Sequence, residues 1–136
     1  MHSSLTFFSI AGQLFAAPTA QIHRFLRFSS SSLEAGDKLR LFDLRTWLGL
    51  EREESGKIIL VEQQRQQVGL LVDTIIDLEI QPPPVLALPP LITAAGCDPA
   101  ISGVTLVDDM PALVLDLEVL ARRLDRQEFF VGDGGR

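Results

Sequence analysis

The stretch of residues 57–80 constrains the fold more than any other part of the sequence. Two apolar runs rich in β-branched residues flank a polar loop at residues 63–67, and this arrangement is typical of a β-hairpin. The second run contains Gly69 and then Asp73 within otherwise apolar strand sequence. A glycine inside a strand weakens it unless the sheet bends sharply or another backbone comes close. The stretch therefore predicts a strongly curved sheet.

Short segments of the same kind recur along the chain. Charged and apolar residues alternate at 38–41, which is the two-residue period of a half-buried strand. Residues 58–61 are apolar throughout, as expected for a strand covered on both faces. We expect strands at residues 5–10, 14–17, 21–28, 38–44, 57–62, 67–74, 75–80, 101–107 and 112–116. Many short strands with few helices predict a mainly β fold of the sandwich or barrel type.

Two segments favour helix. The first is short, at residues 45–50. The second begins after Asp116, which can cap it, and carries an apolar stripe with arginines on the opposite face. The stripe consists of Leu117, Leu120, Ala121 and Leu124. Residues 127–136 end in a glycine-rich sequence and are predicted to form a flexible C-terminal tail.

The N-terminal residues 1–22 contain no Lys, Arg, Asp or Glu and imitate the apolar core of a signal peptide. A signal peptide would carry a charged region before that core, and only His2 precedes it here. The turn signal Ala11-Gly12-Gln13 splits the segment and favours an N-terminal hairpin. The later uncharged stretch at 80–97 is rich in proline, which excludes a lipid-exposed membrane helix.

Length, net charge and residue counts exclude several classes of function. A chain of 136 residues is long enough for one domain with a core of its own. The net charge of −6 argues against nucleic acid, because binding there depends on Lys and Arg neutralising phosphates. Two histidines and the lone Cys97 are too few for a metal cluster, and Cys97 fits a small buried side chain in a reducing compartment.

No catalytic motif is present. The serines lack a Gly-x-Ser-x-Gly elbow, and no glycine-rich phosphate loop occurs. The carboxylate pairs at 53–54 and 108–109 fit a solvated loop and a turn. We therefore expect no enzyme, with no catalytic residues, cofactor or metal. A small-molecule-binding barrel or an enzyme without a recognisable motif stays as an alternative, which a ligand screen by thermal shift would test.

An ordered set of motifs resembles the CheW-like domain. The set consists of Asp43-Leu44-Arg45, Trp47-Leu48-Gly49-Leu50, Ile58-Ile59-Leu60-Val61, Gly69-Leu70-Leu71-Val72-Asp73, Ile101-Ser102-Gly103-Val104 and Leu113-Val114-Leu115-Asp116-Leu117 with the helix after it. These motifs cover residues 36–124, and residues 7–28 look like the opening strands of that domain. The resemblance implies two small five-stranded SH3-like β-barrel subdomains around a shared core, with a short C-terminal helix. It places a single domain at 1–126, with interleaved subdomains.

The resemblance also implies a function. Members of the family are non-catalytic adaptors that couple chemoreceptors to a CheA-type histidine kinase in the cytoplasm. The implied partners are the regulatory domain of the kinase, the cytoplasmic tip of a chemoreceptor, and other CheW-like proteins. A helical receptor tip docks in a groove between the barrels, while the barrel ends meet the kinase. Neither nucleic acid nor direct membrane insertion is expected.

Candidate protein-binding residues are Ile22, Phe25, Leu26, Ala35, Gly36, Gly69 and Asp73. The first three lie in a segment that mixes apolar and basic residues without clean alternation, as an edge strand would. They fit equally well as residues that fill the first barrel. For Gly69 and Asp73, a bend and a carboxylate at a strand end are favoured over binding.

The sequence departs from the family at residues 29–36, where the connection after the third strand is contracted. Leu33-Glu34-Ala35-Gly36 stands where the family pattern has Asn-x-Arg-Gly. Gly36 is kept, but Ala35 replaces the arginine, and alanine cannot replace the fork of donors of a guanidinium. The alternative function is therefore a divergent CheW-like module that recruits or positions another protein without receptor coupling.

Overall fold

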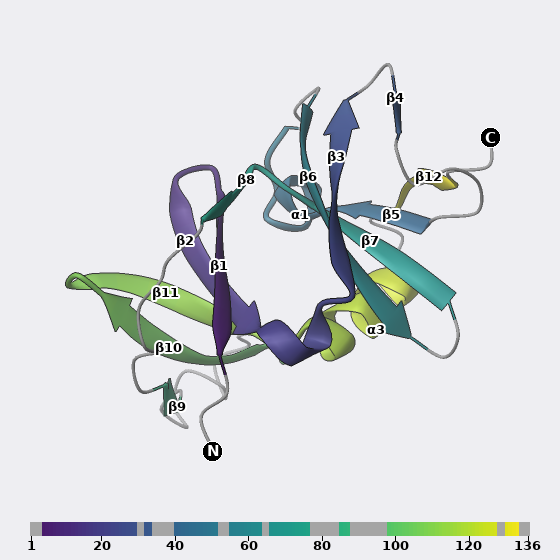
Figure 1. Ribbon diagram of the computed structural model, residues 1–136. Coiled ribbons are helices and arrows are strands. Elements are labelled where there is room, and N and C mark those ends of the chain that lie inside the picture. Colours follow the sequence, from purple (N-terminus) through teal and green to yellow (C-terminus); the bar gives the residue numbers. More distant parts are fainter. Residues whose placement is uncertain are drawn as a thin grey trace.

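The computed structural model describes residues 4–29, 32–33, 40–51, 55–63, 66–76, 85–87, 98–127 and 130–133. Their strands form two mixed sheets, which lie side by side (Figure 1). The first sheet has the order β8 (Thr74–Ile76), β1 (Leu5–Ile10), β2 (Gln13–Pro18), β11 (Met110–Leu115), β10 (Ile101–Val107), β9 (Leu86–Ala87). The second sheet has the order β12 (Phe130–Asp133), β5 (Arg40–Asp43), β7 (Gln66–Val72), β6 (Ser55–Gln63), β3 (Arg24–Ser29), β4 (Ser32–Leu33). The predicted mainly β fold is confirmed.

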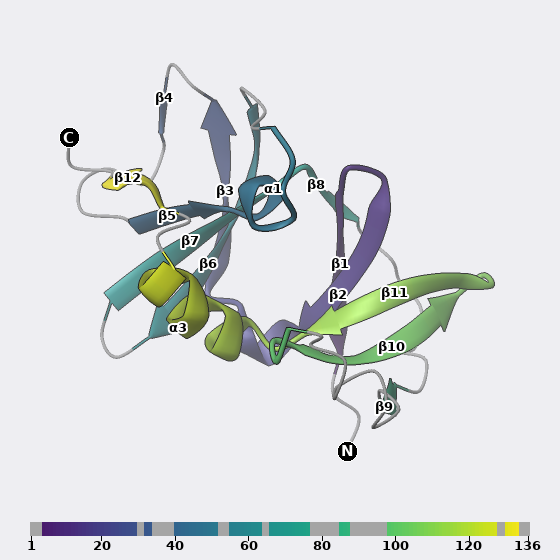
Figure 2. The ribbon, with the colours of Figure 1, turned by 180° about the vertical axis from the view of Figure 1, so that it is seen from behind.

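The described residues also form three short helical elements, of which η1 and α3 lead from the first sheet to the second and α1 lies between two strands of the second sheet. The 3-10 turn η1 (Thr19–Gln21) follows β2, α1 (Leu44–Trp47) follows β5, and α3 (Leu117–Gln127) follows β11. Seen from behind, α3 crosses the face of the second sheet in front of β6 and β7 (Figure 2). Both predicted helices are present. The first starts one residue earlier and is shorter than expected, and η1 delays the start of the third strand from residue 21 to Arg24.

A side-chain cap sets the start of α1, and a glycine backbone conformation sets its end. The carboxylate of Asp43 accepts a hydrogen bond from the backbone N–H of Arg45 and caps the start. At the other end, Gly49 has φ +79°. The N–H of Gly49 donates to the carbonyl of Thr46, and the N–H of Leu50 donates to the carbonyl of Arg45. This pair of bonds is the Schellman motif, in which glycine adopts the left-handed conformation at low cost.

The predicted hairpins are confirmed. β1 and β2 pair from Leu5↔Pro18 to Ile10↔Gln13. Their turn has positive φ at Ala11 (53°) and Gly12 (82°), which is typical of a type I′ turn. β6 and β7 pair as far as Gln63↔Gln66, so their loop is shorter than the sequence suggested. Of the strand expected at 75–80, β8 reaches Ile76, and residues 77–80 lie outside the described residues.

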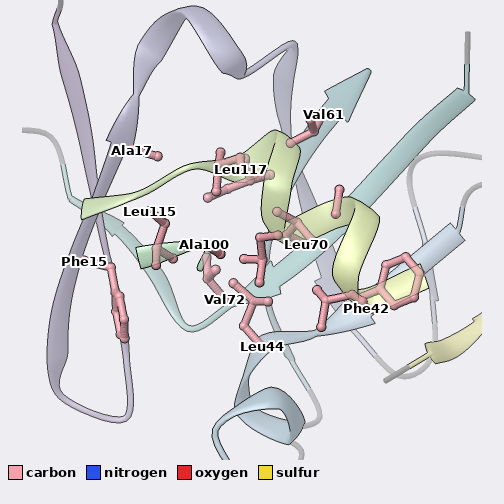
Figure 3. Close-up of a cluster of buried hydrophobic side chains, with 14 of the residues drawn as sticks. Phe15, Ala17, Phe42, Leu44, Val61, Leu70, Val72, Ala100, Leu115 and Leu117 are labelled. Atoms are coloured by element: carbon pink, nitrogen blue, oxygen red, sulfur yellow. The ribbon is translucent and has the colours of Figure 1, made fainter. Parts of the chain in front are cut away.

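Alternate residues of the central strands enter different hydrophobic clusters, which explains their uninterrupted apolar sequence. In β2, Phe15 and Ala17 face a central cluster between the two sheets, while Leu14 and Ala16 face a second cluster. The central cluster also contains residues of α3, such as Leu117 (Figure 3). The second sheet has a third cluster on its other face. The central cluster is thus the shared core that links both sheets.

The remaining two clusters belong to one sheet each. The cluster of the first sheet comprises Phe7, Leu14, Ala16, Val107, Ala112 and Val114. The cluster of the second sheet comprises Phe28, Leu41, Ile58, Leu60 and Leu71. Among the described residues, no pairing joins the end strands of either sheet, so the expected barrel closure is not part of the observed strand order.

Residues 130–133, within the segment expected as a flexible tail, form β12. This strand pairs with β5 in antiparallel fashion, with Phe130 opposite Phe42 and Asp133 opposite Arg40. The glycine-rich sequence of residues 127–136 predicted a tail, because glycine lowers strand propensity. Pairing with the edge of β5 offsets this low propensity.

The turn between β10 and β11 offers a stabilising substitution. Asp108 and Asp109 are exposed and have φ of 48° and 66°, a region that costs non-glycine residues about 1 kcal/mol each. We expect Asp109→Gly to raise the free energy of unfolding by about 0.5–1 kcal/mol, because glycine adopts this conformation freely. Urea denaturation measures the change. Asp109→Ala is the matched control, and a gain of the same size with alanine would contradict the explanation.

Candidate protein-binding groove

Strand β3 presents Phe25 and Leu26 to opposite faces of the second sheet. In the β3–β6 ladder Phe25 lies opposite Ile59, and Leu26 lies opposite Ile58. Leu26 packs against the cluster of the second sheet that contains Ile58. Phe25 shares the face of Ile59, yet its ring remains 45% exposed, whereas Ile59 is fully buried. The strand therefore leaves a large aromatic side chain accessible near the central core.

A groove with a volume of about 330 Å³ lies beside this ring. It is lined by Phe25, Leu26, Arg27, Lys57 and Ile75. β3 and β6 belong to the second sheet, whereas β8, which supplies Ile75, pairs with β1 of the first sheet. The groove therefore lies where the two sheets meet.

Two cations border the groove. Arg27 and Lys57 are direct cross-strand partners in the β3–β6 ladder. The described lining residues include no acidic side chain, although the whole chain carries a net charge of −6. The groove thus combines an apolar surface with a positive border.

Asp73 fixes β8, which forms one wall of the groove. Its Oδ2 accepts a hydrogen bond from the backbone N–H of Ala11 at 2.8 Å and another from Nη1 of Arg45 at 2.7 Å. The backbone N–H of Asp73 donates to the carbonyl of Ser9 at 3.1 Å. The hydroxyl of the next residue, Thr74, hydrogen-bonds that of Ser9. Asp73 therefore ties the first hairpin, α1 and the start of β8 together.

Arg45 reaches Asp73 because α1 begins directly after β5. Asp43 is buried, and its Oδ1 holds the backbone N–H of Arg45 at 2.9 Å. The Nε of Arg45 donates to the carbonyl of Glu51 at 2.8 Å, which orients the guanidinium. The Asp43-Leu44-Arg45 motif thus supplies one half of the ion pair at the junction between the sheets.

Four further polar contacts link the helical elements to Asp98 and to one another. Trp47 of α1 donates from Nε1 to Oδ2 of Asp98 at 3.1 Å, and Nε of Arg123 in α3 lies 3.0 Å from Oδ1 of Asp98. Gln21 in η1 donates to Oδ1 of Asp116 at 2.9 Å and accepts the first backbone N–H of α3 at 2.7 Å. These contacts hold the connections that lead into α1 and α3.

The predicted protein-binding residues occupy different settings. Phe25 and Leu26 line the groove, and Asp73 anchors the strand that forms its far wall. Ile22 packs against the central core. Gly69 is buried in β7, where it pairs with residues of β5 and β6. The structure therefore brings only part of this set together.

Ala35 and Gly36 lie outside the described residues, so their role stays a prediction. The sequence reasoning missed three residues of the groove, namely Arg27, Lys57 and Ile75. Basic residues within the apolar strand that carries Phe25 were the available signal for Arg27. Ile75 follows the polar pair Asp73-Thr74, and only the crossing of β8 to the first sheet places it opposite β3.

The described residues also bear on metal binding, surface charge and membrane-spanning helices. No group of three or more His, Cys, Asp or Glu residues among them could hold a metal ion. His23 Nδ1 and Glu62 Oε1 lie 3.5 Å apart, but both side chains are exposed, which is typical of a surface ion pair. Within the described ranges, no helix combines the length and apolar character that a membrane span requires.

Comparison with known proteins matches residues 4–125 to the CheW-like domain. The crystal structure of the scaffolding protein TtCheW from Thermoanaerobacter tengcongensis is similar, with a TM-score of 0.64 at 22% sequence identity. The similarity covers 88% of this chain and 92% of that one, and it supports the fold. No curated protein sequence matches. Because the family match spans most of the chain, including the residues that line the groove, the chain belongs to the CheW-like domain family.

Proposed function

We propose that this protein is a non-catalytic adaptor of chemosensory signal transduction that couples chemoreceptors to a CheA-type histidine kinase. Membership of the CheW-like family supports a scaffold role. The observation that carries the proposal is the groove at the junction of the sheets, with the exposed ring of Phe25 on its surface. This role places the chain in the cytoplasm, where the receptor tip and the kinase meet.

The groove suits a helical segment. An amphipathic helix docks by placing apolar side chains from successive turns into such a depression. Phe25 and Ile75 supply apolar contact area, and an aromatic anchor of this kind, once buried by a partner, is a typical hot spot of an interface. A carboxylate on the neighbouring turn of the helix would reach Arg27 or Lys57, since guanidinium and carboxylate pair in a bidentate manner. The proposed ligand is therefore an apolar receptor helix with acidic flanks.

A separate surface suits the kinase. We propose that the cluster on each sheet is the interior of a small SH3-like barrel subdomain, whose ends meet the regulatory domain of the kinase or other CheW-like proteins. Leu106 and Met110 support this surface, because they lie beside the β10–β11 turn and are 52% and 56% exposed. Exposed apolar residues close together at the end of a hairpin are common in interfaces.

Two exposed residues separate the two binding functions experimentally. We expect Phe25→Glu to weaken binding of a receptor cytoplasmic-tip fragment by at least about tenfold, or about 1.4 kcal/mol, because it removes an aromatic anchor and adds a charge that repels acidic flanks. Binding of the kinase regulatory domain should be retained. Leu106→Glu is expected to show the reverse pattern. Isothermal titration with both purified partners from the organism that encodes the chain measures the two affinities.

The outcome is decisive in either direction. Failure of the unmodified chain to bind either partner at high micromolar concentration would contradict the adaptor function. If Phe25→Glu weakened receptor-tip binding and kinase binding equally, that result would contradict the assignment of the groove to the receptor. Thermal unfolding of each variant checks that the fold is kept.

The alternative function is that of a CheW-like module that recruits or positions another protein without coupling to a receptor. It is favoured by Ala35, which stands where the family pattern has an arginine. Receptor-tip binding before and after Ala35→Arg distinguishes the two functions, since a gain shows that the missing guanidinium matters. Kinase binding without any receptor binding, in both forms, would support a module that positions another protein.

A further inference from the structure

The C-terminal strand β12 lies beyond the region shared with the family. The family match ends at residue 125, whereas β12 spans Phe130–Asp133. Residues 128–129 alone separate it from the end of α3 at Gln127. α3 itself is anchored, because Leu117, Leu120 and Leu124 are fully buried. The chain therefore extends its anchored last helix with a short additional strand.

β12 completes the edge of the second sheet. Among the described strands it is the terminal one of that sheet, and β5 is its neighbour (Figure 1). Leu41, Phe42 and Asp43 of β5 are buried, and β7 runs parallel to β5 on the other side. Without β12, this largely buried strand would present an unpaired row of backbone N–H and C=O groups, which is a template for pairing with another chain.

The pairing of β12 is weak by its own composition. The register shifts between Phe130 and Gly132, so the ladder is interrupted within four residues. Gly132 lowers strand propensity and raises the entropy lost on ordering. A weakly held strand beside an acceptor edge is suited to exchange.

We propose that the edge of β5 is an interaction surface between copies of this chain, which β12 of a second copy occupies in place of the resident strand. The same backbone hydrogen bonds form in either arrangement, so exchange conserves the ladder. The short connection after α3 favours exchange, because short hinges restrict how well a strand can fold back on its own chain. Exchange would link copies of a scaffold protein and goes beyond the proposed coupling function.

Disulfide trapping tests the exchange in the full chain. One variant carries Arg40→Cys and the other carries Asp133→Cys, both with Cys97→Ser to remove the native thiol. These positions are direct partners in an antiparallel ladder, where Cα separations suit a disulfide. After the two variants are mixed and oxidised, a disulfide between them requires β12 of one copy on β5 of the other. We expect this heterodimer to exceed severalfold the dimer that either variant forms alone, and to increase with protein concentration.

Controls make each outcome decisive. A single chain with both cysteines should form an internal disulfide at low concentration, and failure to do so would overturn the β5–β12 pairing and the proposal with it. Gly132→Pro in the Asp133→Cys chain should abolish the heterodimer, since proline removes a ladder donor. A heterodimer no more abundant than the single-variant dimers would overturn exchange. None of these results depends on receptor or kinase, so they leave the adaptor function to its own test.

Discussion

Phe15→Ala is expected to lower the free energy of unfolding by about 3–5 kcal/mol, the largest effect of any single truncation considered for this protein. Phe15 is 1% exposed and stacks on Phe8 with ring centroids 5.8 Å apart. It belongs to the first sheet but lies in the central cluster that both sheets share (Figure 3). Removing the ring leaves a cavity that rigid strands on both sides cannot fill.

The same variant tests whether the sheets unfold together. Trp47 is the only tryptophan, lies in α1 after a strand of the second sheet, and packs against the central cluster. We expect its fluorescence and the far-ultraviolet circular dichroism to report one coincident transition in urea, shifted equally by Phe15→Ala. Phe25→Ala is the control, with a cost below about 1 kcal/mol because the ring is half exposed. A Trp47 transition that does not move would contradict the shared core.

Asp73→Ala is expected to cost about 2–3 kcal/mol of stability, because it removes a charge-assisted hydrogen bond to Arg45 together with the acceptor for the N–H of Ala11. The side chains of the pair are only 24% and 17% exposed, so water replaces these contacts incompletely. Asp73→Asn should cost less, since an amide oxygen can still accept from Ala11. Urea denaturation of both variants measures the difference.

A double-mutant cycle separates the energy of the Arg45–Asp73 ion pair from the other contacts that each substitution removes. Arg45 also donates to the carbonyl of Glu51, so Arg45→Ala has a cost of its own. We expect a coupling energy of at least about 1 kcal/mol between Arg45→Ala and Asp73→Ala, as found for residues in one hydrogen-bond network. A coupling near zero would show that the first hairpin and α1 are held by packing alone. Receptor-tip binding by Asp73→Asn would then show whether the position of β8 matters for the groove.

Much of the local structure was predictable. The hairpin of β1 and β2 follows from Ala11-Gly12, whose backbone adopts the positive φ that a tight turn needs. The last helix follows from the stripe that includes Leu120 and from Asp116, whose carboxylate accepts the N–H groups of Glu118 and Val119. Each of these signals acts between residues that are close in sequence. The turn and the capped helix start therefore form without contacts to distant parts of the chain.

The candidate site was predictable only in part. Phe25 and Leu26 were recognised because their strand mixes apolar and basic residues without alternation. Lys57 joins the groove through the β3–β6 pairing, and Ile75 joins it because β8 pairs with β1 of the first sheet. The sequence predicted a tail where β12 lies, because a glycine-rich segment does not favour a strand. The pairing partner of β12, β5, is distant in the sequence.

The sequence by itself determined the longer strands, the tight turn between β1 and β2, the cap of the last helix and, through its ordered motifs, the family, whereas the short strands β4, β9 and β12 were not expected. The tertiary structure alone decided the parallel pairs β2–β11 and β5–β7, the sharing of one core by both sheets, and the groove between them. The reason is physical. Turn and cap chemistry is set by neighbouring residues, whereas parallel pairing depends on which distant strands can bury both apolar faces at once.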